Sequence, residues 1–87
     1  MERMTIPAGT LTHWRVDPRG MYRVAADLVS QIDTGQISRY AGLPDNQTLA
    51  SRNDASIRSV IRAKEMLADR YRYLIREDGR YYLNGGD

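Results

Sequence analysis

The sequence predicts an α+β fold in which three helices are followed by a C-terminal β-hairpin. Apolar residues recur at helical spacing between residues 21 and 67. Within that stretch, capping and breaking residues mark three separate helix starts. After Tyr71 the pattern changes to two short β-rich runs on either side of Asp78-Gly79, a pair typical of a two-residue hairpin turn. At 87 residues, the chain has the size of one small domain.

The first predicted helix covers residues 21–32. Its apolar residues lie at i, i+3, i+4, i+7, i+8 and i+11, and they are Met21, Val24, Ala25, Leu28, Val29 and Ile32. Such a single stripe at helical period favours packing against a core. Asp17-Pro18 is typical of a helix start, although Gly20 favours a later one, and Gly35 is typical of a helix end.

The second predicted helix is short and starts at Asp45, whose side chain is a good N-cap with Thr48 three residues on. Asn53-Asp54 ends it. A tight turn between two short helices is the centre of a helix-turn-helix, so the next helix is the one of most interest.

The third predicted helix covers residues 56–69 and is capped by Ser56. Its inward row consists of Val60, Ala63 and Leu67. Three polar residues adjoin elsewhere on the helical wheel, and they are Arg58, Ser59 and Arg62. This helix therefore presents one polar, basic face.

The β-rich runs predict a hairpin over residues 72–83. With Asp78-Gly79 as its turn, Arg76 lies opposite Tyr81. Residues 1–11 are expected to form a flexible arm, residues 12–84 the folded domain and residues 85–87 a tail. Weak alternation over residues 12–16 indicates a short N-terminal edge strand, and its Trp14 is expected to pack on the domain.

The composition argues against several classes of protein. Without cysteine there is no disulfide framework and no thiolate metal site. No apolar run has the length of a membrane span, and the N-terminus lacks the apolar core of a signal peptide, which predicts a cytoplasmic protein. His13 is the only histidine, and no carboxylate pair, nucleophile with its base or phosphate loop stands at useful spacing. We therefore expect no enzyme, no cofactor and no metal.

The positive charge is concentrated in the second half of the chain. Residues 1–51 hold five arginines and five acidic residues, whereas residues 52–80 hold eight basic and five acidic residues. Twelve of the thirteen basic residues are arginine, whose planar fork suits phosphates and guanine edges. A GC-rich genome would explain the preference for arginine over lysine, but it explains the skew along the chain less easily.

Three segments in register resemble the N-terminal winged helix-turn-helix of GntR-type transcription regulators, over roughly residues 16–83. The family's D-x-x-x-x-Tyr entry and its I-x-x-G helix end are matched by Asp17, Tyr22 and residues 32–35. Its L-P-S-E-x-x-L-A corresponds to LPDNQTLA at residues 43–50, and its V-S-x-x-T-V-x-x-A-x-x-x-L to ASIRSVIRAKEML at residues 55–67.

The chain also departs from this family. Gln47 and Ile57 stand where the family usually has arginines that meet DNA, and Tyr71 and Tyr81 replace glycines after the recognition helix and in the wing. The family's large effector or dimerisation domain is absent from this sequence. The chain is therefore expected to be either an excised domain or a small stand-alone factor of the kind that phages and plasmids carry.

The resemblance implies a sequence-specific transcription regulator that binds double-stranded DNA. The third helix would lie in the major groove, and the hairpin wing would lie on the backbone or in the minor groove. The residues expected at the DNA are Gln47, Ser56, Ile57, Arg58, Ser59, Arg62, Arg76, Gly79 and Arg80. One such module buries only about 600–1,000 Å², so a homodimer or a partner protein is expected for tight binding. No small-molecule effector is expected within this chain.

Ile57 and Ile61 leave a second interpretation open. They adjoin on the third helix, next to the basic face. Exposed apolar pairs contact thymine methyl groups, but they also mark protein interfaces. The alternative is therefore a winged-helix protein–protein interaction or assembly factor, and the salt dependence of duplex binding separates the two.

Overall fold

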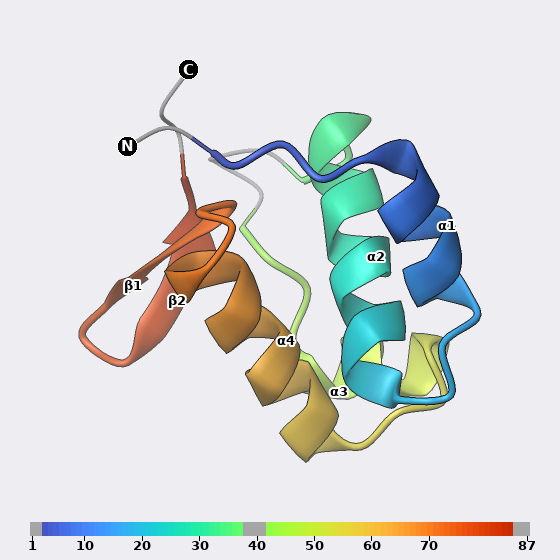
Figure 1. Cartoon of the computed structure of the whole chain (residues 1–87). Helices are drawn as coiled ribbons and strands as arrows, with labels where there is room; N and C mark the ends of the chain where they lie inside the picture. The colour runs from blue at the N-terminus through green and yellow to red at the C-terminus, as the bar shows by residue number, and fades with distance from the viewer. Residues whose placement is uncertain (1–2, 38–41, 85–87) are drawn as a thin grey trace.

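The computed structural model describes residues 3–37 and 42–84. In these residues an α+β fold places four helices before a two-stranded antiparallel hairpin (Figure 1). The elements are α1 (Ala8–Arg15), α2 (Gly20–Asp33), α3 (Asn46–Arg52), α4 (Ile57–Asp69), β1 (Leu74–Glu77) and β2 (Arg80–Leu83). None of the described helices is both long enough and apolar enough to cross a membrane.

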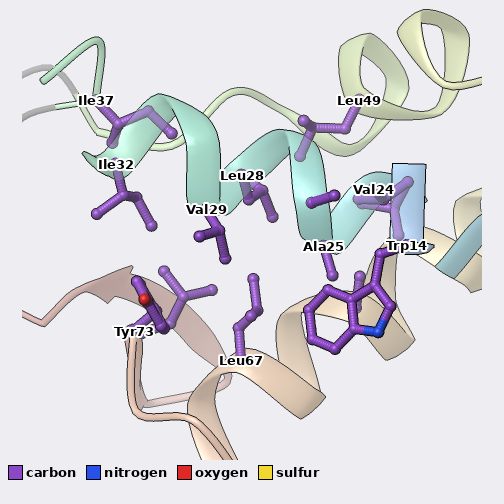
Figure 2. Packing of buried hydrophobic residues seen from close by; sticks show 14 of the residues in the cluster. Trp14, Val24, Ala25, Leu28, Val29, Ile32, Ile37, Leu49, Leu67 and Tyr73 are labelled. Carbon is purple, nitrogen blue, oxygen red and sulfur yellow. The ribbon is translucent and has the colours of Figure 1, made fainter. Parts of the chain in front are cut away.

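Helix α2 is the centre of the core. It packs against both α1 and α4, while α3 and β1 pack against α4. Figure 2 shows Trp14, Leu67 and Tyr73 gathered beside the face of α2 that carries Ala25 and Val29. The predicted apolar stripe of the first helix is therefore confirmed as the face that is buried on folding.

Both ends of α2 match the sequence expectation, since the helix begins at Gly20, which is the later of the two starts that the sequence left open. Gly35 adopts φ +79°, and the N–H groups of Gly35 and Gln36 donate to the carbonyls of Ile32 and Gln31, which is a Schellman motif. At the other end the N-cap is Arg19, not Asp17. The earlier start at Asp17 is excluded, because the buried Asp17 carboxylate accepts hydrogen bonds from the backbone N–H and the guanidinium of Arg19, which lies two residues further along the chain.

Residues 12–16 were predicted as a strand, and this prediction was wrong because residues 8–15 form α1. The helix brings Leu11 and Trp14, three residues apart, onto one side, where Trp14 is buried against the rings of Tyr22 and Tyr71 at 5.5 and 5.6 Å. An edge strand would have to leave the hydrogen-bonding edge of that segment open, whereas the helix satisfies it internally. The expected burial of Trp14 is confirmed.

Residues 3–7 also lie on the domain rather than apart from it. The N–H of Met4 donates to the carbonyl of Tyr71 at 2.8 Å, and Ile6 is only 5% exposed. Residues 8–11, expected in a flexible arm, are the first turns of α1. The N-terminal segment thus covers the junction between α4 and the hairpin.

The two helix caps predicted around the α3–α4 turn are confirmed. The Asp45 carboxylate accepts a hydrogen bond from the N–H of Thr48 at 2.7 Å, and the Ser56 hydroxyl accepts one from the N–H of Ser59 at 3.1 Å. Between the helices, Asp54 turns the chain with φ +49°. Each cap therefore fixes where a helix begins, and the turn fixes how α4 leaves α3.

The hairpin has the predicted register. Leu74 faces Leu83, Ile75 faces Tyr82, Arg76 faces Tyr81 and Glu77 faces Arg80. Asp78 and Gly79 both adopt positive φ, 53° and 76°, as a two-residue type I′ turn requires. Because side chains alternate, one face of the hairpin carries Leu74 toward the core and the other faces solvent.

A candidate nucleic-acid interface

The N-terminal half of α4 exposes two arginines. Arg58 and Arg62 are both solvent-exposed, and within residues 3–37 and 42–84 neither guanidinium has a hydrogen-bond or ion-pair partner. They lie four residues apart and therefore adjoin on the helix surface. The sequence predicted these two residues as one basic face, and the structure places them together.

Two isoleucines lie beside the arginines. Ile57 is 40% exposed and Ile61 is 41% exposed. Together with Met21 from the start of α2, they line a shallow hollow of about 700 Å³ that also contains Arg58, Arg62 and Glu65. The exposed face of α4 is therefore mixed, with apolar surface bordered by positive charge.

Ser56 and Ser59 are bound to each other. Their hydroxyl oxygens are 3.1 Å apart, and the Ser56 hydroxyl also holds the N–H of Ser59. Ser59 is half-buried against the start of α2, where a Cβ on Gly20 would lie 3.4 Å from its hydroxyl oxygen and 2.7 Å from the Cβ of Ala55. Both serines thus set the start of α4, and Ser56 is the more exposed of the two.

The C-terminal half of the same face is acidic and is tied to the hairpin. Arg76 of β1 donates to the Asp69 carboxylate at 3.0 Å and lies 3.9 Å from the Glu65 carboxylate. Its guanidinium also donates to the Tyr81 hydroxyl at 3.2 Å, and this hydrogen bond is the main reason that the pKa of Arg76 is raised above its ordinary value. Arg76, expected at the DNA, is therefore engaged in holding the hairpin against α4.

The tip of the hairpin and the start of α3 lie next to α4. A groove of about 430 Å³ is lined by Asn46, Ile61, Lys64, Gly79, Arg80 and Tyr81. Ile61 lines both this groove and the hollow beside Arg58, so the two adjoin at this residue. Arg80 is exposed and has no hydrogen-bond or ion-pair partner in the described part of the chain, and Gln47 is exposed on the first turn of α3.

Lys64 also lines this groove, although it is not among the residues that the sequence predicts at the DNA. It is 8% exposed and donates to the side-chain oxygen of Asn46 at 2.7 Å. Desolvation lowers the pKa of its ammonium group, an effect that the charge of Asp45 partly opposes. A signal was present, because Lys64 lies four residues after Val60 and so falls on the inward stripe of α4, where a lysine is unusual.

Side chains of α2 make hydrogen bonds with the turn that precedes α4. The Arg23 guanidinium donates to three backbone carbonyls, those of Asn53 at 3.2 Å, Asp54 at 2.9 Å and Asp17 at 2.6 Å. The Asp27 carboxylate accepts from the Asn53 amide at 2.9 Å and from Arg52 at 3.0 Å. Arg23 and Asp27 thus connect α2 to the α3–α4 turn.

The remaining polar groups include a histidine and carboxylates, which are side-chain types that can hold a metal ion. Among the residues that the structure describes, no three histidine, cysteine, aspartate or glutamate side chains are grouped so as to hold a metal ion. His13 is exposed on α1, and its ring nitrogen is 4.0 Å from the Asp17 carboxylate. The Asp17 carboxylate is itself committed to Arg19, whose side-chain hydrogen bond is the main cause of its lowered pKa.

Fold and surface together define a small α+β protein with a basic face on one helix, flanked by a hairpin tip. Comparison with models of known protein families, with curated proteins and with solved structures found no match for this chain. The resemblance to GntR-type regulators therefore stays a prediction from the sequence motifs.

Proposed function

We propose that this protein is a winged helix-turn-helix that binds double-stranded DNA and regulates transcription, with α4 in the major groove and the hairpin as its wing. The observation that supports this most directly is the pair of arginines, Arg58 and Arg62, which are exposed on the N-terminal half of α4 and have no partner among the described residues. Recognition helices of this class contact base edges with their N-terminal residues. A bacterial or phage regulator of this kind would act in the cytoplasm.

The charge distribution supports this orientation of α4. Arg58 and Arg62 offer donors to guanine edges or phosphates, and exposed Ile57 and Ile61 offer apolar contacts to thymine methyl groups. Glu65 lies further along the same face and would repel phosphates. The N-terminal half of α4 would therefore approach the bases, and the C-terminal half would point away from the duplex.

The elements beside α4 would contact the backbone. Ser56 and Gln47 are exposed at the starts of α4 and α3, and Gly79 and Arg80 form the exposed tip of the hairpin. Contacts to phosphate fix the register of a protein on the duplex and carry no direct sequence information. A single module of this size buries only about 600–1,000 Å² on DNA, so we expect a homodimer or a partner protein at the operator.

Selection of bound fragments from the source genome, followed by substitution of Arg58 and Arg62 by alanine, tests this function. Each variant should weaken binding to the selected duplex by about 1–3 kcal/mol, and a variant that loses a base contact should also discriminate less between sequences. Arg15→Ala removes the same charge from α1, where Arg15 is bonded to Ser30, and it should leave binding within about twofold of wild type. Equal binding by the wild type and by both α4 variants would refute the assignment of α4.

A second candidate function is recognition of another protein through the same hollow. It is favoured by the exposure of Ile57 and Ile61 beside Met21. In that case the protein should bind no duplex even at low ionic strength. In size-exclusion chromatography it should elute as a dimer or complex, and Ile61→Ser should disrupt that assembly. DNA binding, by contrast, should weaken steeply as salt rises from about 50 to 200 mM.

A further inference from the structure

Lys64 carries a buried positive charge that the protein itself satisfies incompletely. An ammonium group has three donors, and in the described residues only one of them has a partner, the neutral side-chain oxygen of Asn46 at 2.7 Å. No carboxylate of the described residues lies within ion-pair distance of it, and the charge of Asp45 acts on it only from further away. Burying a charge without a counter-ion is costly, so a buried ammonium of this kind favours an anionic ligand.

The surroundings of Lys64 would suit such an anion. The groove of about 430 Å³ that it lines is also lined by Arg80 and Gly79 of the hairpin tip and by Asn46 of α3. Arg80 brings a second positive charge that has no partner among residues 3–37 and 42–84. Among the described residues, no aspartate or glutamate lines this groove, in contrast to the hollow on the other side of Ile61, which contains Glu65.

We infer that Lys64 and Arg80 form a binding site for one phosphate group, and that in the complex with DNA this site holds a backbone phosphate between α4 and the hairpin tip. The inference rests on the proposed function, because the site adjoins the face of α4 that carries Arg58 and Ile61. Lys64 would supply a fixed ammonium at the base of the groove, and Arg80 would close over the phosphate from the tip. The phosphate would thereby set the distance between the hairpin and α4 on the duplex.

Lys64→Met tests the site, because methionine has a similar length and removes only the charge and its donors. With a short duplex taken from the selected fragments, the variant should bind about tenfold more weakly at 0.1 M salt, and the slope of log K against log salt should be smaller by about 0.9, the value for one phosphate. Arg80→Met should behave in the same way. Arg70→Met is the matched control, since Arg70 is exposed on the C-cap of α4 and stacks on Tyr71 at 5.5 Å, and its slope should not change.

Measurements of stability separate this role from a structural one. Lys64→Met should be at least as stable as the wild type in urea, because an apolar side chain replaces a buried charge. Lys64→Gln, which keeps a donor for Asn46 without the charge, should bind the duplex as weakly as Lys64→Met. Full binding by Lys64→Gln, or a Lys64→Met variant that is less stable but has an unchanged salt slope, would overturn the inference.

Inorganic phosphate distinguishes failure of this site from failure of DNA binding. Titrated into the wild type at constant ionic strength, phosphate should shift the amide resonances of Gly79 and Arg80, and the shifts should vanish in Lys64→Met. If these shifts occur while the wild type binds no duplex, the anion site stands and the proposed function falls. If the duplex binds the wild type and Lys64→Met equally, the Lys64 site is refuted while the proposed function is retained. If phosphate shifts the resonances of both proteins equally, the Lys64 site is refuted whatever the result with the duplex.

Discussion

Single side chains divide the exposed surface of α4 into two halves of opposite charge. Arg58 and Arg62 lie in the N-terminal half, and Glu65 and Asp69 lie in the C-terminal half, next to Arg76. A helix that is basic only over its first two turns can approach a polyanion end-on or at an angle, but not along its full length. The arrangement of charge on one helix therefore restricts how the whole protein can dock.

Ser56 offers a residue-scale test, because its cap function and its proposed role at DNA can be separated. Ser56→Asp should fold as stably as the wild type, since aspartate caps helices as well as serine does and its charge suits a helix N-terminus. The same variant should bind the duplex more weakly, because the new carboxylate would meet phosphate. Ser56→Ala should instead lose about 1 kcal/mol of stability. Urea unfolding and duplex titration measure the two effects, and wild-type binding by Ser56→Asp would remove Ser56 from the interface.

The turn between α3 and α4 is positioned by α2 at the scale of elements. Arg23 donates to three backbone carbonyls from two different loops, and Gly20 lets the start of α2 approach Ala55 directly. Neither helix α3, with seven residues, nor the turn after it would hold this geometry without tertiary contacts. Helix α2 is thus the support that sets the direction of α4.

Gly20→Ala tests this support. A Cβ at Gly20 would lie 2.7 Å from the Cβ of Ala55, so α2 and the α4 N-terminus must move apart. We expect a loss of about 1–3 kcal/mol from overpacking, although alanine is the better helix former. Gly9→Ala is the control, because no atom of residues 3–37 and 42–84 lies within 4 Å of the added Cβ in α1, and it should gain about 0.5–1 kcal/mol. If thermal denaturation shows both variants to be stabilised, the close approach of α2 and α4 is absent in solution.

At the scale of the whole molecule, the N-terminal residues complete a small core. Ile6 and Trp14 are each 5% exposed, and both belong to the same cluster as the residues of α2 and α4. In Figure 1 the N-terminal segment crosses between α1 and the base of the hairpin. A chain of this length buries a limited core, so each such residue contributes a large share of the stability.

Ile6→Ala measures that contribution. It should cost about 2–5 kcal/mol in urea unfolding, as for other buried isoleucines. Met4→Ala, only two residues earlier but at a side chain that is 56% exposed, should cost less than about 0.5 kcal/mol. Equal effects of the two substitutions would show that residues 3–7 do not pack on the domain.

The sequence predicted what local patterns control. The period of α2, the caps Asp45 and Ser56 and the Asp78-Gly79 turn depend on residues within four positions of each other, and the structure has all of them. Helix α1 was not predicted because apolar and polar residues alternate weakly over residues 12–16, as in a strand. The helical signal in this segment is limited to Leu11 and Trp14. Its helical form depends on burial of Trp14 beside Tyr71, more than fifty residues away in the chain.

The sequence by itself determined where α2, α3, α4 and the hairpin begin and end, and that Arg58 and Arg62 share a face, because helical period, caps and turns are local. Only the tertiary structure decided which charged side chains have partners within the protein. Arg76 is bound to Asp69 across two elements, Arg23 is bound to three carbonyls, and Lys64 is buried beside the hairpin tip. The reason is that an ion pair or a buried charge is set by distance in space, and the partners here come from different elements of the fold.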